Sequence, residues 1–193
     1  HKGYVQCVAA APDGRHAVSG GLDKTIRLWD LASRASLRTM GGLEVTPFVA
    51  LSPDGRFVLS QGIGGAISFW ELATGRCVQR FEGHAKNVQA LALTPDGRHA
   101  ASGDEDGGIV FWDFSAASPM GLTGLKELRN AGSVRALAIL PDGRQVLAGG
   151  DDAVIRVWDT ASGKLVMDLS GHGKAVSALA VADGGRLAVS GSW

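Results

Sequence analysis

A Trp-Asp or Trp-Glu dipeptide returns at a nearly constant interval along this chain of 193 residues. Successive tryptophans lie 41, 42 and 46 residues apart in the four copies, Trp29-Asp30, Trp70-Glu71, Trp112-Asp113 and Trp158-Asp159. A repeat of about 40–45 residues that ends in Trp-Asp is typical of arrays in which each copy forms one small sheet. Such a copy needs neighbours to bury its hydrophobic faces. The period therefore predicts a row of similar sheets.

A glycine-containing turn recurs with the same period. Four copies read Pro-Asp-Gly and the fifth reads Asp-Gly-Gly: Pro12-Asp13-Gly14, Pro53-Asp54-Gly55, Pro95-Asp96-Gly97, Pro141-Asp142-Gly143 and Asp183-Gly184-Gly185. Proline presets φ for a turn, aspartate bonds the nearby backbone, and glycine takes the positive φ. Upstream of every turn an alanine occupies the same strand position, although alanine has low strand propensity. Packing in a crowded inner strand explains the choice at Ala9, Ala50, Ala92, Ala138 and Ala180.

Each copy has the pattern of four strands. A second strand follows the turn, as at residues 16–19, and a third strand ends in the tryptophan. In the third strand of the first copy, period-two alternation places Ile26 and Leu28 on one face and Arg27 and Trp29 on the other. A weaker fourth strand is clearest at residues 76–81 and 164–169. Each repeat is therefore predicted to be a four-stranded meander.

One copy carries a family resemblance. Gly83-His84, Pro95-Asp96-Gly97, Ser102, Asp106 and Trp112-Asp113 together resemble a WD40 repeat, and the resemblance extends over essentially the whole chain. It implies an all-β, WD40-type β-propeller with about four and a half blades: residues 1–41, 42–82, 83–129, 130–170 and a partial blade at 171–193. We expect residues 1–193 to be a segment of a larger, seven-bladed ring that self-associates through its open blade edges. A closed four-bladed ring is the alternative, but it leaves the hairpin at 175–190 unplaced.

The resemblance also implies a buried hydrogen-bonded set in each blade, made of a histidine, a serine, an aspartate and the tryptophan. In blades one and three the sets are His1, Ser19, Asp23 and Trp29, and His84, Ser102, Asp106 and Trp112. Blade two has Gly42 and Gly64 at the histidine and aspartate positions. Blade four has Asn130 and Ala148 for histidine and serine but keeps Asp152 and Trp158, and the partial blade has His172 and Ser190. A buried polar network stabilises only when it is satisfied, so blades two and four are predicted to be the softer ones.

Composition argues against several classes of protein. Lys+Arg and Asp+Glu both count 19, and no basic stripe is visible, so no nucleic-acid partner is expected. No apolar run reaches the length of a membrane span, and no signal peptide is present. Because the sequence starts at His1 and not at a methionine, a leader that has been removed remains an alternative. Cys7 and Cys77 occupy non-equivalent positions, which favours a reducing compartment and a cytoplasmic location.

The sequence contains no recognisable catalytic, cofactor or metal constellation. The blade histidines recur once per repeat, no two histidines have metal-ligand spacing, and His16 and His99 are expected to be exposed. Residues 104–108 resemble part of a calcium loop but lack its further oxygen ligands. The glycines at 62–65 have no Lys-Ser/Thr after them, as a phosphate-binding loop would. Neither Gly-x-Ser-x-Gly nor a Cys paired with a placed His appears. The chain is therefore predicted not to be an enzyme.

The resemblance implies that loops after Gly-His and turns around the structural aspartate share one face of the ring, and at these positions the repeats differ. The candidate partner-binding face comprises Tyr4, Leu22, Lys24, Ile63, Lys86, Asn87, Glu105, Asp151, Lys174 and Trp193. Apolar or aromatic groups beside charges are typical of interface anchors. The alternative is that these residues differ between repeats only because loop positions tolerate substitution. Residues 114–125 are expected to form an extended loop on the opposite face.

We expect a non-catalytic scaffold that binds a protein or peptide within a larger protein. An alternative is a ligand-sensing propeller fused to a kinase or a nucleotide-hydrolysing switch, whose signature would lie outside this sequence. A propeller hydrolase with a site in the central channel is a third hypothesis, but the alanine-rich inner strands argue against it. In each case function has to be found in sites that the fold carries.

Overall fold

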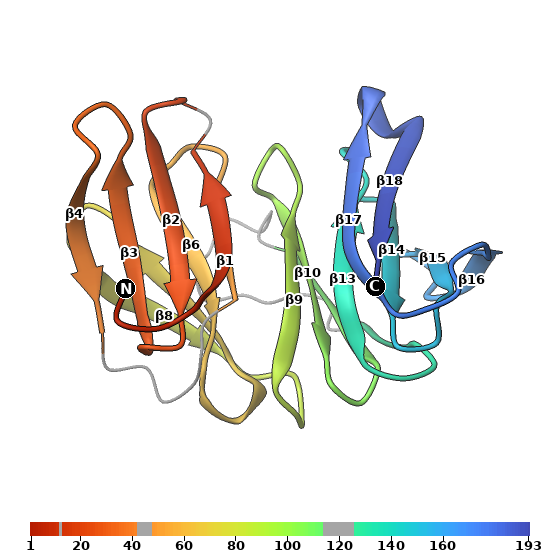
Figure 1. Ribbon diagram of the computed structural model, residues 1–193. Helices are drawn as coiled ribbons and strands as arrows, with labels where there is room; N and C mark the ends of the chain where they lie inside the picture. The colour runs from red at the N-terminus through yellow and green to blue at the C-terminus, as the bar shows by residue number, and fades with distance from the viewer. Residues whose placement is uncertain (12, 42–47, 114–125) are drawn as a thin grey trace. The chain divides into compact units, whose positions relative to one another are not determined.

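The computed structural model describes residues 1–11, 13–41, 48–113 and 126–193. These residues form two compact units, His1–Asn87 and Val88–Trp193 (Figure 1). Apart from two short 3-10 turns, η1 (Ile63–Gly65) and η2 (Asp183–Gly185), the regular structure in the described residues is all β-strand.

The first unit contains two four-stranded antiparallel sheets. Blade one has the strand order β1-β2-β3-β4 and blade two the order β5-β6-β7-β8, so each is a simple meander. The strands are β1 (Val5–Ala10), β2 (His16–Gly21), β3 (Thr25–Asp30), β4 (Ala35–Met40), β5 (Val49–Leu51), β6 (Phe57–Gln61), β7 (Ile67–Glu71) and β8 (Arg76–Phe81).

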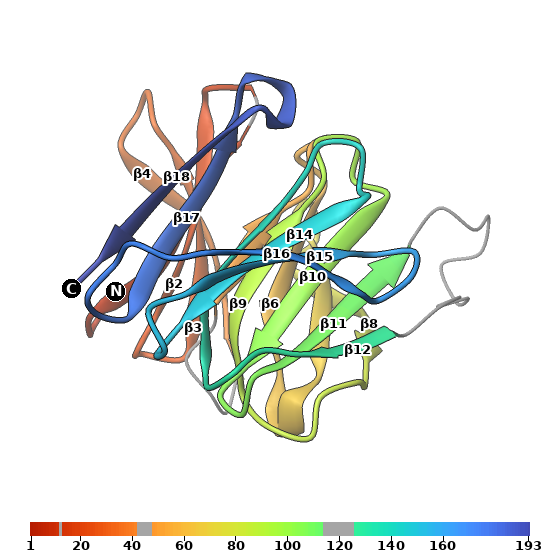
Figure 2. The ribbon, with the colours of Figure 1, turned by 90° about the vertical axis from the view of Figure 1, so that its right-hand side faces the viewer.

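The second unit contains two further four-stranded meanders and one two-stranded sheet. The two strands of that last sheet, β17 and β18, lie next to each other in Figure 2. Blade three is β9 (Val88–Leu93), β10 (His99–Asp104), β11 (Gly108–Asp113) and β12 (Lys126–Arg129). Blade four is β13 (Val134–Ile139), β14 (Gln145–Gly150), β15 (Ile155–Asp159) and β16 (Leu165–Leu169). The fifth sheet pairs β17 (Val176–Ala182) with β18 (Leu187–Ser192).

The Asp-Gly turns between first and second strands have the chemistry that the sequence predicts. Gly14 and Gly55 have φ values of +65° and +68°, in the left-handed region that glycine adopts without strain. The Asp54 carboxylate accepts hydrogen bonds from the Ser52 hydroxyl at 2.5 Å and from the Arg56 N–H at 3.0 Å. Burial raises the pKa of Asp54, but these hydrogen bonds and the nearby Arg56 charge outweigh it, so the pKa is lowered overall. The turn aspartate is thus an anchor for the backbone.

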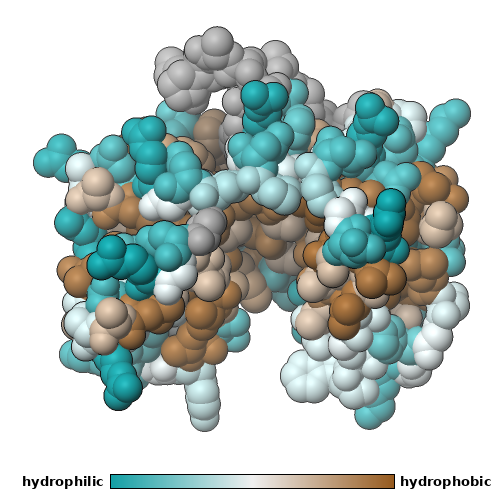
Figure 3. All heavy atoms as spheres, turned by 90° about the horizontal axis from the view of Figure 1, so that it is seen from above, coloured by the Kyte–Doolittle hydropathy of each residue, from teal (hydrophilic) through white to brown (hydrophobic). Residues whose placement is uncertain are grey.

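Hydrophobic side chains pack between adjacent blades inside each unit. In the first unit Ile26 and Met40 of blade one share a core with Val58 and Trp70 of blade two. In the second unit the corresponding face of blade three packs against blade four, and Ile155 of blade four packs against β17. Apolar residues also reach the surface between polar ones (Figure 3).

The repeated inner-strand alanine is not equally enclosed in every sheet. Ala50 and Ala138 are buried, Ala9 and Ala92 are partly buried, and Ala180 is exposed. Crowding of neighbouring strands therefore explains the choice of alanine in the four-stranded blades but not at Ala180.

The fold class predicted from the sequence is confirmed: four antiparallel four-stranded blades and about half of a fifth. The predicted loop at 114–125 and Gly42, at the histidine position of blade two, lie outside the described residues. Within the described ranges, no helix has the length and apolar character needed to span a bilayer.

Candidate functional site: an exposed loop surface on blade one

Blade one contains a connected set of polar side chains at one end of its sheet. The hydroxyl of Ser19 on β2 accepts a hydrogen bond from the Trp29 indole at 2.7 Å and lies 2.6 Å from Nε2 of His1. The other ring nitrogen, Nδ1 of His1, lies 2.8 Å from a carboxylate oxygen of Asp23. Indole, hydroxyl, imidazole and carboxylate thus form one chain that ties the first residue to β2 and β3.

The Asp23 carboxylate also holds the backbone of two neighbouring segments. It accepts hydrogen bonds from the Lys2 N–H at 2.8 Å and from the Thr25 hydroxyl at 2.7 Å, and it lies 3.5 Å from the Arg27 guanidinium. Burial by itself would raise the pKa of Asp23. The hydrogen bonds and the Arg27 charge outweigh this effect, so the pKa of Asp23 lies below its usual value. The carboxylate therefore stays charged at neutral pH and fixes the loop before β1 against the β2–β3 turn.

Four exposed side chains lie on these two fixed loops: Lys2, Tyr4, Leu22 and Lys24, which we name the blade-one loop surface. The Leu22 N–H donates to the Tyr4 carbonyl at 2.8 Å, and the Lys24 N–H donates to the Gly21 carbonyl at 3.0 Å. The exposed fractions of Tyr4 and Leu22 are 82% and 44%. Among the described residues neither Lys2 nor Lys24 has an ion-pair partner. An aromatic and an aliphatic group stand here beside two positive charges on a rigid base.

The other residues of the predicted face are distributed over both units. In the first unit Lys86 and Asn87 are exposed, and Ile63 lies in η1, where its side chain is outside the description. In the second unit Trp193 and Lys174 are exposed and Glu105 is partly buried. Asp151 is exposed and forms an ion pair with Arg135. In blade one a backbone hydrogen bond joins the Tyr4 and Leu22 segments of the predicted face.

The indole-to-serine bond recurs in blades two and three. Trp70 donates to the Ser60 hydroxyl at 2.9 Å, and Trp112 donates to the Ser102 hydroxyl at 2.7 Å. Blade two keeps this bond although Gly64 stands at its aspartate position. In blade three the predicted histidine, His84, is buried.

The turn of blade three holds a carboxylate that the sequence reasoning missed. Asp104, only 5% exposed, accepts hydrogen bonds from the N–H groups of Asp106 at 3.0 Å and Gly108 at 2.7 Å. Asp106, the predicted member of the set, is an exposed residue. A Cβ at position 108 would lie 2.5 Å from a carboxylate oxygen of Asp104, so the glycine there was the available signal.

Blade four replaces the set with a different one. Ala148 stands at the serine position, and the buried indole nitrogen of Trp158 has no hydrogen-bond partner among the described residues. The Arg156 guanidinium contacts the Asp152 carboxylate and donates to the Asn130 side-chain oxygen at 2.9 Å. The sequence reasoning missed Arg156, although it occupies the same strand position as Arg27, which contacts Asp23 in blade one.

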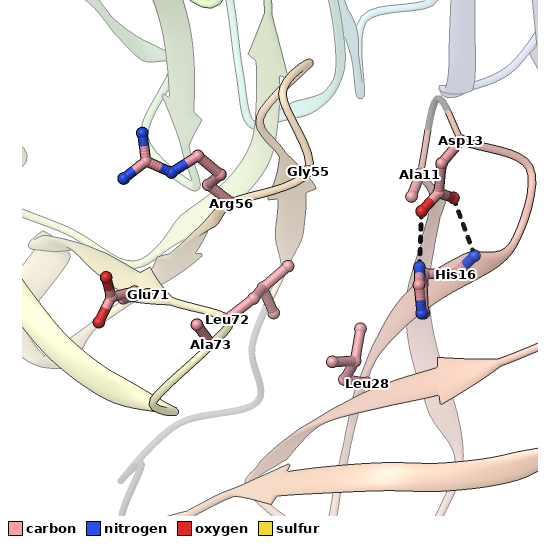
Figure 4. A pocket seen from close by; sticks show the side chains of 9 residues that line it. All are labelled: Ala11, Asp13, His16, Leu28, Gly55, Arg56, Glu71, Leu72 and Ala73. Atoms are coloured by element: carbon pink, nitrogen blue, oxygen red, sulfur yellow. Dashed lines mark hydrogen bonds and ion pairs between the residues drawn. The ribbon is translucent and has the colours of Figure 1, made fainter.

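A hollow of about 260 Å³ lies at the opposite, Pro-Asp-Gly end of the first unit (Figure 4). Leu28 and Leu72 line it, and on one wall Asp13 is bonded to Nδ1 of His16 at 2.6 Å. This bond, with that from the Arg15 N–H, lowers the Asp13 pKa to about 2.

The sequence-based expectation that His16 and His99 are exposed was wrong. Both side chains are partly buried, and the His99 ring stacks on Phe111 with 5.4 Å between the ring centroids. Both rings pack because the strand brings an acidic or aromatic partner beside them.

The described residues offer little for metal or thiol chemistry. They contain no group of three or more His, Cys, Asp and Glu side chains that could hold a metal ion. Cys7 and Cys77 are both free thiols. Burial raises the pKa of the Cys7 thiol, which lowers the fraction of the nucleophilic thiolate.

Comparison with known proteins supports the reading of the repeats. The family model "WD domain, G-beta repeat" matches residues 1–30, 75–113, 124–159 and 163–193, together more than half of the chain. Small ribosomal subunit protein RACK1 of Medicago sativa and that of Glycine max are each 50% identical over 40 residues. These 40 residues are 21% of this chain and 12% of either relative.

Proposed function

This chain belongs to the WD40 repeat family, and from that premise we propose that it is a non-catalytic scaffold, cytoplasmic in location, that binds a protein or peptide through the blade-one loop surface. The observation that carries the proposal is the exposure of Tyr4 and Leu22 on loops fixed by the partly buried Asp23 carboxylate. Aromatic groups on a rigid base anchor interfaces at a low cost in conformational entropy.

The charges of this surface specify the kind of partner. Lys2 and Lys24 flank the two apolar groups, and Asp23 is already engaged by His1, Thr25 and the Lys2 N–H. An acidic segment with one aromatic or aliphatic anchor would complement both features, and charge attraction would raise its association rate. The 40-residue match to a ribosomal-subunit protein supports the repeat itself, and we take no partner from it.

Selection of peptides from a random displayed library on the immobilised chain tests the proposal. We expect the selected peptides to combine Asp or Glu with an aromatic or aliphatic residue. Their affinity should fall at least 10-fold for Tyr4→Glu/Leu22→Glu, because the change removes the anchors and adds charge that repels an acidic ligand. Fluorescence anisotropy at several salt concentrations measures the loss and shows whether the lysines contribute.

Leu37→Glu is the matched control, because Leu37 on β4 of the same blade is a leucine at least as exposed as Leu22, with 53% of its surface accessible against 44%. It should leave the affinity unchanged. Peptides that bind the double variant as tightly as the original chain would place the binding surface elsewhere and refute the proposal.

A further inference from the structure

His16 and His99 occupy the same position of the repeat, the first residue of the second strand, yet their rings lie in different places. The His16 ring is bonded through Nδ1 to the Asp13 carboxylate at 2.6 Å. The His99 ring lies instead over the turn of the next blade, where a Cβ added to Gly143 would be 2.8 Å from its Nδ1. A Cβ added to the equivalent Gly55 would meet nothing within 4 Å, so the His16 ring leaves this position open.

The residue two positions before the turn aspartate differs between blades one and three. In blade three the Thr94 hydroxyl donates to the Asp96 carboxylate at 2.5 Å. Blade one has Ala11 there, whose side chain has no donor, and the Asp13 carboxylate takes the ring of His16 as its partner. The turn aspartate of blade one therefore holds the histidine away from the next blade.

The side chain on which the ring can stack also differs. In blade three His99 stacks on Phe111, with 5.4 Å between the ring centroids. Blade one has the smaller Leu28 at the corresponding position of the third strand. The hollow of about 260 Å³ in the first unit is lined by Leu28 together with Gly55 and His16. An imidazole ring that turned inward from β2 would therefore have room there.

The charges around His16 favour the outward position when the ring carries a proton. Asp13 contacts Nδ1, and the Asp30 carboxylate at the end of β3 lies 4.0 Å from Nε2. The side chains of Arg56 and Glu71 point away from His16 across the hollow (Figure 4). A protonated ring that moved between the apolar walls would leave its carboxylate partner and lose hydration, which is costly, whereas a neutral ring loses much less. Among the described residues, the charged groups near the ring are Asp13 and Arg15 from the turn, Asp30 from β3, and Arg56 and Glu71 from blade two.

We propose that His16 is a pH-sensitive latch with two positions. Bonded to Asp13, the ring leaves the hollow open. After the ring loses its proton it turns inward and lies over Gly55, in the position that His99 takes over Gly143. Histidine side chains change charge between about pH 5 and 8, so a rise in pH across this range closes the hollow and tightens the packing between blades one and two.

Nuclear Overhauser effects between the His16 ring protons and the α protons of Gly55, measured on the 193-residue chain from about pH 5 to 8, test the proposal. We expect this cross-peak to grow roughly 3-fold or more as the pH rises, because the population shifts towards the inward position. The cross-peak between His99 and Gly143 should stay constant, and it serves as the reference for an inward ring. A His16 cross-peak that does not grow, or one that already equals the reference at the lowest pH, would overturn the proposal.

Two substitutions test whether the Asp13 carboxylate holds the ring. Asp13→Asn keeps an oxygen for the backbone N–H groups of the turn but removes the charge, so the His16 cross-peak should be strong even at about pH 5. Ala11→Thr gives Asp13 a hydroxyl partner like that of blade three and should act in the same direction. Asp142→Asn, at a turn of the second unit that has no following histidine, is the matched control and should leave the His16 profile unchanged. A folded Asp13→Asn variant, with dispersed amide resonances, that keeps the original pH profile would overturn the proposal.

Discussion

Blades one and four have the same strand order and turn type, yet they secure the end of the sheet in different ways. In blade one a serine accepts the indole of Trp29 and joins it to His1 and Asp23. In blade four Ala148 leaves the indole of Trp158 without a partner among the described residues, and Arg156 joins Asp152 to Asn130 without it. The strand framework therefore tolerates loss of the polar set, because apolar packing between blades holds each sheet.

The difference also affects where a loop surface can be built. In blade one the polar set fixes two loops that expose Tyr4 and Leu22. In blade four the buried Ser133 hydroxyl and the side-chain nitrogen of Asn130 also have no partner among the described residues. A buried donor or acceptor without a partner costs about 1–3 kcal/mol. We therefore expect the loops of blade four to open locally more readily than those of blade one.

The largest effect is expected when blade one is made to resemble blade four. Ser19→Ala removes the acceptor of the Trp29 indole and the partner of His1 Nε2. The free energy of unfolding should fall by about 2–4 kcal/mol, because two buried polar atoms lose their partner. Urea denaturation measures it, with Ser36→Ala on the exposed strand β4 as the control. A loss no greater than that of the control would mean that the polar set contributes nothing to the stability of blade one.

The reverse change should stabilise blade four by a smaller amount. Ala148→Ser places a hydroxyl where the other complete blades have one, and the Trp158 indole can then donate to it. We expect a gain of about 0.5–1.5 kcal/mol in the free energy of unfolding. Ala136→Ser is the matched control, since it adds a hydroxyl at a buried strand position that has no orphaned indole to bond, and it should not stabilise. Destabilisation by Ala148→Ser would show that blade four has repacked around the alanine.

The smallest effect concerns the Asp-Gly turns, where blade one has His16 and blade four has Gln145 at the corresponding position. The pKa of Asp13 is lowered from 3.8 to about 2, chiefly by the His16 hydrogen bond. A lowered carboxyl pKa stabilises the fold above pH 3.8, and this stabilisation is lost as the pH falls towards 2. His16→Gln should raise the Asp13 pKa towards 3.8 and flatten the pH dependence of the Tm in that window. An unchanged NMR titration of the Asp13 carboxyl would exclude the hydrogen bond as the cause.

The fold could be predicted from the sequence because its signals are local and repeated. Gly14 and Gly55 mark turns through their conformational freedom, and the alternation at Ile26–Trp29 marks a strand with two different faces. The serine ten residues before each of Trp29, Trp70 and Trp112 recurs often enough to be paired with it in sequence.

The remaining features depend on side chains that repeat imperfectly, so the period could not reveal them. Asp104 lies two residues from the predicted Asp106, and of the features that separate the two positions only Gly108, which makes room for the Asp104 carboxylate, is visible in the sequence. Arg156 joins Asn130 to Asp152 in blade four alone, and a substitution that occurs in a single repeat gives no recurring pattern to read.

Hydrogen exchange of the indole N–H groups, followed by NMR, tests the central claim that the repeat tryptophans organise the blades through serine. The account predicts slow exchange for Trp29, Trp70 and Trp112, whose indoles donate to serine hydroxyls. Exposed Trp193 should exchange rapidly, and Trp158 should exchange faster than the three bonded indoles, because its N–H has no acceptor among the described residues. Equal protection of Trp158 and Trp29, or rapid exchange of Trp29, would contradict the account.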